Sequence, residues 1–485
     1  MSSRVSIKKN FIMNAILTMS AFIFPLITFP YVSRVLQPEG TGKVAFATSL
    51  ITYFNMISNL GIPTYGIRAC AQVRDDKERL TKTVQELLLI NIITTIVAYL
   101  ALSIALLSIP KLFEDRTLYL IVSLNIILST IGMEWLYKGL EQYSYITIRS
   151  LIFKAVSVIL MFLLVHEKSD YVIYGGITIF AASASNVLNF FNSYKYISLK
   201  PVGSYNLKKH MKPVLMFFAM TVATTIYTNL DTVMLKFLTT DIDVGYYNAA
   251  VRIKTILVSI VTSLGAVLLP RSSYYVEHHQ MDEFKRVSGK AIEFVFIFAT
   301  PLMLFFMLFA REGIYLLSGT SYKGSIIPMQ IIMPTLLFIG LSNITGMQIL
   351  VPLGKEKIVL YSEIAGAITD FVINMLLIPK YSSSGAALGT VIAELVVLLV
   401  QYCFLKKYVN SMFRKVRYWI IILAMVLSSL SSTWVKGISI NNFFALVIAA
   451  VLFFGVYVIV LLVLREPLTV VLFKAFTRKL KLKND

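Results

Sequence analysis

Long apolar runs alternate with short polar segments along the whole of this 485-residue chain. A helix that crosses a bilayer needs about 20 predominantly apolar residues, and the runs have that length. They predict fourteen spanning helices, at residues 11–33, 44–64, 84–109, 118–138, 148–165, 171–193, 213–237, 245–269, 291–310, 325–350, 358–378, 385–405, 419–435 and 441–463. The pattern is typical of an all-α polytopic membrane protein.

Composition supports this class, because 57% of the residues are hydrophobic, only 14% are charged and the mean hydropathy is +0.76. Soluble domains carry about 25% charged residues. The net charge of +20 would suggest a nucleic-acid partner in a soluble protein. Here the basic residues lie between apolar runs, so the lipid bilayer is the expected partner and nucleic acid is not.

Lysine and arginine predict the orientation, because cytoplasmic segments of membrane proteins are enriched in both. With the N-terminus inside, the inner segments hold 33 basic residues and the outer segments hold 10. Both termini are therefore expected in the cytoplasm. The outer connections are too short for a soluble catalytic domain, so we do not expect an enzyme. The longest inner loops are predicted at Tyr194–Lys212 and Arg271–Lys290.

An internal repeat relates the two halves of the chain at offsets of 202–204 residues. Gly42, Gly61 and Arg68 recur as Gly245, Gly265 and Arg271, and Arg34 recurs as Lys236. Six spans return the chain to the side on which it started, so the copies should be parallel. The repeat predicts a lobe at residues 1–205, a second lobe at 206–410, and two extra spans with a basic cytoplasmic tail at 411–485. The functional cavity is expected between the lobes.

Spans seven and eight carry charges at similar predicted depth. Asp231 and Arg252 are equally distant from the turn between these spans. Arg252 shares its helix face with Asn248, Thr255, Ser259 and Thr262, whereas Lys254 points elsewhere and is expected to reach toward a lipid head group. Asp231 would offset part of the desolvation of Arg252. A role in substrate binding or gating and a purely structural ion pair both remain open.

A second hairpin brings acidic residues together. Glu363, Asp370 and Asn374 share one face of the eleventh span, and Glu394 lies in the twelfth, with the turn centred on residue 382. Two carboxylates at equal depth require a shared proton or a cation between them. This predicts an ion-coupling site. The alternative is that Asp370 and Glu394 face different neighbours, each with its own hydroxyl or amide partner.

Two further positions have simpler interpretations. Glu134 and Lys138 are four residues apart and predict a surface ion pair. Lys154 lies near the start of the predicted fifth span, and its ammonium group is expected to reach the membrane surface.

Five motifs, spread in order over most of the chain, resemble the polysaccharide transporters. These are the Wzx-like flippases of the multidrug/oligosaccharidyl-lipid/polysaccharide exporter superfamily. The motifs are "NAILTMSAFIFPLITFPYVSRVLQPEGTG" (14–42), "NLGIPTYGIRACA" (59–71), "EWLYKGLEQYSYITIRS" (134–150), "VGYYNAAVRI" (244–253) and "NMLLIPKYSSSGAALGTVIAE" (374–394).

The resemblance implies two six-helix lobes around a V-shaped cavity that opens alternately to each side of a bacterial cytoplasmic membrane. Its implied cargo is an undecaprenyl-pyrophosphate-linked oligosaccharide, moved to the outer leaflet for polysaccharide synthesis. Arg252 is then the expected head-group contact, with Arg34 and Lys236 as outer contacts and Asp231 as a charge partner. The resemblance also implies a chain that works as a monomer, alongside polysaccharide polymerase or other assembly proteins.

Relatives that flip a peptidoglycan precursor imply a sodium site formed by spans seven, eleven and twelve, where this chain has Asp231, Asp370 and Asn374. Asp231 thus has two candidate roles, as partner of Arg252 or as ion ligand. No G-x-x-x-x-G-K-[ST] loop for ATP is present. No cofactor is therefore expected, beyond a coupling H⁺ or Na⁺. The alternative functions are a multidrug/cation antiporter of the same superfamily and a non-transporting scaffold for glycan-assembly enzymes.

Overall fold

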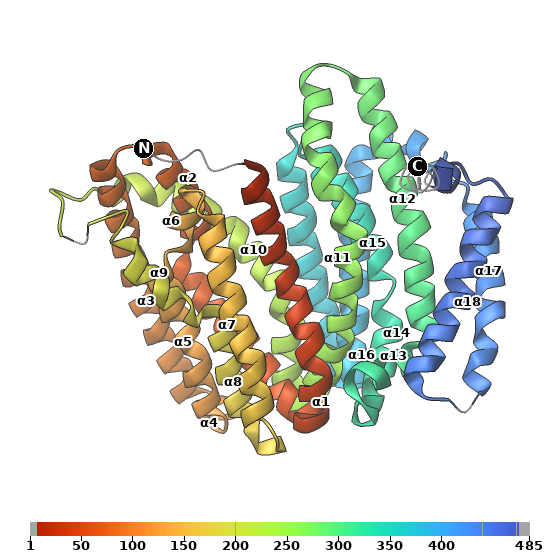
Figure 1. The fold of residues 1–485 in the computed structure, drawn as a ribbon, viewed down its shortest axis with the longest axis horizontal. Coiled ribbons are helices and arrows are strands. Elements are labelled where there is room, and N and C mark those ends of the chain that lie inside the picture. The colour runs from red at the N-terminus through yellow and green to blue at the C-terminus, as the bar shows by residue number, and fades with distance from the viewer. Residues whose placement is uncertain (1–6, 199, 439, 472, 475–485) are drawn as a thin grey trace, which may run out of the picture. The chain divides into compact units, whose positions relative to one another are not determined.

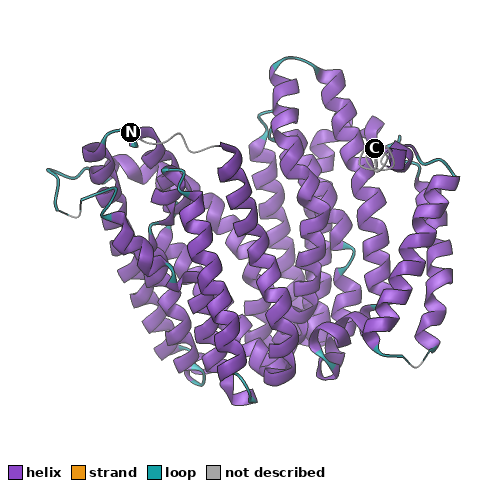
Figure 2. Ribbon diagram, viewed as in Figure 1, coloured by secondary structure: helices purple, strands orange, loops and turns teal. Residues whose placement is uncertain are grey.

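The computed structural model describes residues 7–198, 200–438, 440–471 and 473–474. These residues form helices and connecting loops, with no strand among them (Figure 2). The chain divides into two compact units, one ending at Gly245 and the other beginning at Tyr246. Most of the predicted N-terminal tail and residues 475–485 of the predicted basic tail lie outside the described residues. The predicted lobe boundaries remain a prediction.

In the described part of unit 1, ten α-helices and one π-helix precede α11 (Figure 1). They are α1 (Ile7–Asn59), α2 (Ile62–Val73), α3 (Lys77–Ser108), α4 (Pro110–Phe113), α5 (Arg116–Gly132), α6 (Glu134–Gly139), α7 (Tyr143–Leu164), α8 (Tyr171–Ile179), the π-helix Phe180–Ala184, α9 (Asn186–Ser193) and α10 (Lys208–Leu238). A short 3₁₀ turn, Lys168–Asp170, precedes α8.

Unit 2 holds most of α11 (Asp241–Glu277) and the remaining helices. They are α12 (Met281–Leu308), α13 (Ala310–Ser318), α14 (Ile326–Ile332), α15 (Thr335–Asn343), the π-helix Ile344–Leu350, α16 (Glu356–Phe413), α17 (Tyr418–Thr433) and α18 (Asn442–Val463). The last two helices pack against each other. Short 3₁₀ turns lie at Thr320–Ser325 and Trp434–Gly437.

Eleven helices of the described chain are long and apolar enough to cross a membrane, or twelve if the bent pair Thr320–Ile332 and Thr335–Leu350 is one span. Two of them contain a residue with non-helical backbone angles, Gln37 in α1 and Ser382 in α16. Each break lies where the sequence predicts a turn between two spans. The all-helical membrane class is confirmed, and the count of fourteen stays a prediction.

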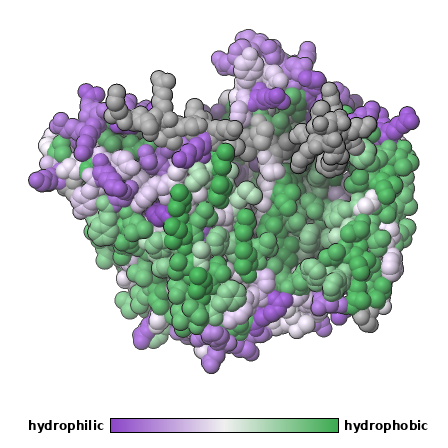
Figure 3. Space-filling view, viewed as in Figure 1, coloured by the Kyte–Doolittle hydropathy of each residue, from purple (hydrophilic) through white to green (hydrophobic). Residues whose placement is uncertain are grey.

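The predicted inner loop at Arg271–Lys290 is wrong. The α11 helix continues to Glu277 and α12 begins at Met281, so only three residues separate them (Figure 1). Hydropathy marks the part of a helix inside the membrane, and the polar ends of these two helices continue beyond it. Figure 3 shows the same division, with hydrophobic residues along the middle of the helices and hydrophilic residues near their ends.

Three helical segments of unit 1 are interrupted near their predicted inner ends. The breaks lie at Leu60 (φ 48°), at Met133 (φ 41°) and after the π-helix at Ser185. A carbonyl near each break accepts a side-chain hydrogen bond: Ser58 O from Asn91 Nδ2 at 2.8 Å, Gly132 O from Asn189 Nδ2 at 2.7 Å and Ser185 O from Arg149 Nη1 at 2.6 Å. An unsatisfied backbone group within a membrane is costly, so these side chains make the breaks stable.

Candidate functional site

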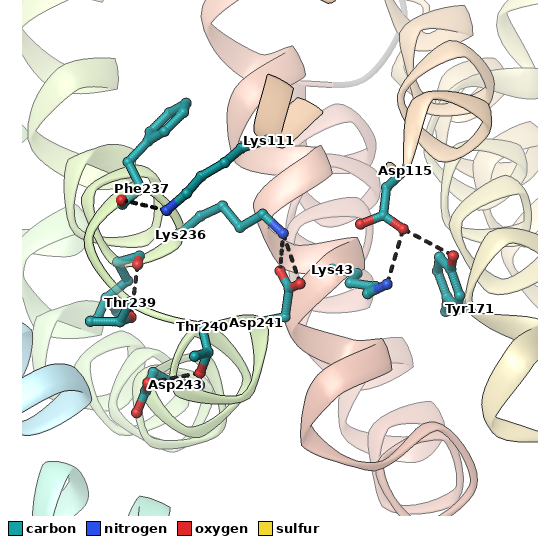
Figure 4. A network of polar contacts seen from close by, with 11 residues as sticks. Lys43, Lys111, Asp115, Tyr171, Lys236, Phe237, Thr239, Thr240, Asp241 and Asp243 are labelled. Atoms are coloured by element: carbon teal, nitrogen blue, oxygen red, sulfur yellow. Dashed lines mark hydrogen bonds and ion pairs between the residues drawn. The ribbon is translucent and has the colours of Figure 1, made fainter. Parts of the chain in front are cut away.

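Charged residues meet at the predicted outer end of unit 1 (Figure 4). Lys43 Nζ lies 3.1 Å from Asp115 Oδ1, and the Tyr171 hydroxyl donates to the same oxygen at 2.9 Å. Asp115 is buried, and the lysine is also 4.8 Å from the centre of the Tyr171 ring. The Lys43 charge is thus balanced within the protein.

Lys236, predicted to contact the substrate head group, is 6% exposed and held by an acidic partner (Figure 4). Its Nζ lies 2.6 and 2.7 Å from the two carboxylate oxygens of Asp241. Lys111 Nζ donates to the carbonyl of Phe237 at 2.8 Å, which caps the end of α10. A phosphate contact to Lys236 remains a prediction and would compete with Asp241. Arg34, the other predicted outer contact, is exposed.

Three threonines and Asp231 form a polar stripe on α10 in unit 1. The hydroxyl groups of Thr221, Thr224 and Thr228 each donate to the carbonyl four residues earlier. Thr224 and Thr228 are exposed, whereas Asp231, at the end of the stripe, is 7% exposed. Exposed polar residues at membrane depth usually face a water-filled space rather than lipid.

The α11 stripe belongs to unit 2. Arg252 is half-buried there, Thr255 is exposed and Ser259 is half-buried. Asp231 lies in unit 1 and Arg252 in unit 2. Their ion pair, and the sodium site that would combine Asp231 with Asp370 and Asn374, therefore stay predictions.

Asp370 and Asn374 are brought together in unit 2, at 1% and 0% exposure. Both belong to the first half of α16, and both face Gly389 in its second half. A Cβ placed on Gly389 would lie 2.2 Å from Asn374 Oδ1 and 3.3 Å from Asp370 Oδ1. The missing side chain of Gly389 thus makes room for two oxygen atoms that could bind a cation. The described residues contain no cluster of three or more His, Cys, Asp or Glu side chains fit for a metal ion.

The neighbouring turn of α16 adds a buried hydroxyl pair. The Tyr247 hydroxyl and Thr390 Oγ1 are 2.9 Å apart. Glu394, one helical turn beyond Thr390, is buried, and Glu363 is half-buried two turns before Asp370. The structure thus places Asp370 and Asn374 at one point, while the roles of Glu363 and Glu394 in ion coupling stay predictions.

The sequence did not single out a buried carboxylate at the predicted inner end of unit 1. The Glu86 side chain is fully buried; its Oε2 lies 2.6 Å from Lys209 Nζ and 2.9 Å from His210 Nε2, and its Oε1 accepts from Asn206 N at 2.8 Å. The Tyr65 hydroxyl is 2.9 Å from His210 Nδ1. Glu86 lies near the polar start of a span, where hydropathy gives no signal of burial.

Gln85, the residue before Glu86, forms hydrogen bonds with the segment that leads to α10. Gln85 Nε2 donates to the carbonyls of Ser198 and Lys200 at 2.8 Å each, and its Oε1 accepts from the Tyr205 hydroxyl at 3.0 Å. Gln85 and Glu86 together fix the segment between α9 and α10, and with it the start of α10.

The motif at 134–150 has a structural explanation. The predicted pair of Glu134 and Lys138 is confirmed at 2.8 Å. Glu141 lies 2.8 Å from Arg74, and this hydrogen bond raises the pKa of the exposed arginine. Arg149 is buried and also donates to Asn186 Oδ1 at 3.1 Å, so it fastens α7 to the break before α9.

The prediction that Lys154 extends to the membrane surface is wrong. The α7 helix begins at Tyr143, five residues before the predicted span, so Lys154 lies near its midpoint. Its Nζ donates to Ser20 Oγ in α1 at 2.7 Å.

Comparison with known proteins identifies relatives over most of the chain. The family described as polysaccharide biosynthesis protein matches residues 7–276. A protein of Escherichia coli (strain K12) that is named as an O-antigen transporter is 23% identical over 84% of this chain and 98% of its own length. The capsular polysaccharide biosynthesis protein CapF of Staphylococcus aureus is 23% identical over 82% of this chain and 98% of its own length.

Solved structures show the same fold. The lipid II flippase MurJ, in an inward closed conformation, matches with a TM-score of 0.70 at 19% identity, over 94% of this chain and 99% of its own. An inward-facing multidrug-resistance transporter of the MATE family, from the MOP superfamily, matches with a TM-score of 0.62 at 14% identity, over 84% of this chain and 99% of its own.

Proposed function

Because this chain belongs to the polysaccharide biosynthesis protein family, we propose that it is a flippase for polyprenyl-pyrophosphate-linked oligosaccharides. The observation that carries the proposal is the family match together with relatives, aligned over 98% of their length, whose names refer to O-antigen transport and capsule synthesis. The named relatives support a transporter rather than an enzyme.

The chemistry of this cargo fits a membrane protein with polar helix faces. A pyrophosphate and several sugars cannot cross a hydrocarbon core of about 30 Å without a polar path. The hydroxyls of Thr224 and Thr228 in unit 1, and Arg252 with Thr255 in unit 2, offer such groups at membrane depth. Arg252 would bind phosphate, and Arg34 would contact the head group near the outer end. The polyprenyl tail would stay in lipid.

Ion coupling is a further part of the proposal. The buried Asp370 and Asn374 around Gly389 supply carboxylate and amide oxygens for Na⁺, or a carboxylate for H⁺. Binding at this point would bias unit 2 toward one state of the transport cycle. We place the protein in a bacterial cytoplasmic membrane with both termini in the cytoplasm, acting as a monomer beside the polymerase and other glycan-assembly proteins.

The test is to express this chain in bacteria that lack their own glycan flippase and to measure surface polysaccharide. Strains that make different glycans should be used, because a mismatched cargo would hide activity. Wild type should restore surface glycan in at least one strain, and Arg252→Ala should lose most of it at equal protein level. Arg286→Gln, at an exposed ion pair with Glu283, is the matched control and should behave as wild type.

The multidrug/cation antiporter remains the second candidate, because the MATE transporter shares the fold. It predicts drug resistance in the same cells and no surface glycan in any strain. A scaffold for glycan-assembly enzymes predicts instead that Arg252→Ala and Asp370→Asn keep full function.

A further inference from the structure

The first helix of the chain runs beside α7 in a constant register. Three hydrogen bonds join them: Thr147 Oγ1 to Met13 O at 2.9 Å, Lys154 Nζ to Ser20 Oγ at 2.7 Å, and Tyr31 OH to Val165 O at 2.8 Å. Each joins residues 134 positions apart, so the two helices are parallel and do not slip along the contact. The first and third of these bonds have hydroxyl donors, whereas the donor of the second is an ammonium group.

A lysine at the position of the second bond carries a free-energy cost, because it places a charge deep in the membrane. Lys154 is the twelfth residue of the 22-residue helix α7, so both membrane surfaces are about equally far away. Within the described part of the chain, no carboxylate lies within ion-pair distance of its Nζ. A serine or threonine would tie the helices without a charge, as the other two bonds do.

The surroundings of the ammonium group leave it able to bind an anion. An ammonium has three N–H donors, and Ser20 Oγ accepts one of them. The ring of Phe24 lies 6.0 Å from Nζ and helps to stabilise the cation. The Lys154 side chain is half-buried rather than sealed in the core, whereas Ser20 is buried.

We propose that Lys154 is a second cationic contact for the substrate, binding a phosphate of the lipid-linked pyrophosphate at the middle of unit 1. This inference rests on the proposed function. Phosphate groups occur in membrane lipids as well as in the cargo. Phospholipid head groups lie at the surfaces, and a pyrophosphate reaches the middle of the membrane only while it is being transported.

The direct test is binding to purified protein in detergent, measured as a shift in thermal unfolding. The probes are undecaprenyl pyrophosphate and, separately, phosphatidylglycerol. Loss of a hydrogen bond to a charged group weakens binding by about tenfold or more. We therefore expect Lys154→Met to weaken the binding of undecaprenyl pyrophosphate by at least about tenfold. Lys154→Arg should keep most of the affinity. The response to phosphatidylglycerol should be the same in all variants.

Two controls separate binding from a structural role. Ser20→Ala removes the tie between the helices but keeps the ammonium, so it should retain binding. If Lys154 only fastens α7 to α1, Ser20→Ala and Lys154→Met should lose binding and thermal stability together, which would overturn the proposal. Lys254→Met, at a half-buried lysine within α11, is the matched charge control and should bind as wild type does.

The same variants distinguish failure of this inference from failure of the proposed function. If wild type binds undecaprenyl pyrophosphate and restores surface glycan, but Lys154→Met does both equally well, only the role of Lys154 is wrong. If wild type neither binds it nor restores glycan in any strain, the proposed function fails and this inference fails with it. If Lys154→Met instead loses only the response to phosphatidylglycerol, Lys154 binds a membrane lipid and not the cargo.

Discussion

Gly42 and Gly245, which the internal repeat relates to each other, lie against one another's helices. A Cβ on Gly42 would be 1.9 Å from the carbonyl oxygen of Asp241 and 2.9 Å from the nitrogen of Gly245. A Cβ on Gly245 would be 2.0 Å from the carbonyl oxygen of Pro38. Small residues permit such crossings, which stabilise helix pairs in membranes through close packing.

We expect Gly42→Ala and Gly245→Ala to destabilise unit 1 strongly, because either methyl group would strike backbone that cannot rotate away. Overpacking in a core costs about 1–3 kcal/mol and sometimes more, and these distances place both variants at the upper end. Thermal unfolding in detergent checks this. Gly455→Ala is the control, since a Cβ there meets nothing within 4 Å and alanine favours helix. Unfolding temperatures equal to that of wild type would contradict the crossing.

The pair of Lys236 and Asp241 can be tested with a double-mutant cycle. Lys236→Met or Asp241→Leu alone leaves a largely buried charge without its partner and should cost about 3 kcal/mol. The double variant should recover most of that stability, because no charge is left unpaired. Thermal unfolding of the four proteins gives the coupling energy.

Surface glycan in the same four strains tests the predicted head-group contact at Lys236. If the lysine serves only to balance Asp241, the stable double variant should transport. Transport lost in the stable double variant would assign Lys236 to the substrate, as the sequence predicts.

We expect Gly389→Ala to impair ion coupling, although no ionisable residue is replaced. The new methyl group would displace Asn374 Oδ1, 2.2 Å away, and press on Asp370. Transport by wild type in proteoliposomes should slow when the sodium and proton gradients are both removed. Gly389→Ala and Asp370→Asn should already show the slow rate with gradients present.

Gly289→Ala is the control for that experiment, because its Cβ would make an ordinary 3.8 Å contact with Met412. Wild-type rates in Gly389→Ala would argue against an ion site at this position.

Glu86→Gln should destabilise the inner end of unit 1. The substitution removes the charge that faces Lys209 and His210 and leaves a buried hydrogen-bond network incomplete, at a cost of about 3 kcal/mol. Limited proteolysis of the segment between α9 and α10 should become faster, because the single amide oxygen of a glutamine cannot replace both carboxylate oxygens, one facing Asn206 N and the other facing Lys209 and His210. Glu283→Gln, at an exposed pair with Arg286, should cost less than about 1 kcal/mol. Equal effects of the two substitutions would contradict the assigned role of Glu86.

Hydropathy predicted the membrane class and most helices, because the apolar length needed to cross a bilayer is a property of local sequence. It also predicted the turn at residue 382, where Ser382 has non-helical angles. The polar ends of α11 and α12 were missed, because an amphipathic helix outside the membrane has no apolar run to mark it.

The hydrogen bonds between distant helices of unit 1 could not be predicted from the spacing of residues along the sequence. Lys154 was placed near the surface because its span was started five residues late, and its partner Ser20 is 134 residues away. Glu86 and His210 are 124 residues apart, and such pairs depend on which helices become neighbours. Asp370 and Asn374 were predicted together because both lie on one helix face, where the helical period alone brings them close.

The register between α1 and α7 also affects how the protein is made. Ser20 is synthesised 134 residues before Lys154, so at about 5–20 residues per second the first helix waits on the order of ten seconds for its partner. During that interval its hydroxyl and carbonyl groups must be satisfied by water, lipid or the insertion machinery. A cysteine placed by Ser20→Cys should react with a thiol reagent in ribosome-bound chains that stop before α7, and should be protected once α7 has been inserted. The hydrogen bonds between α1 and α7 can therefore form only after α7 has been inserted.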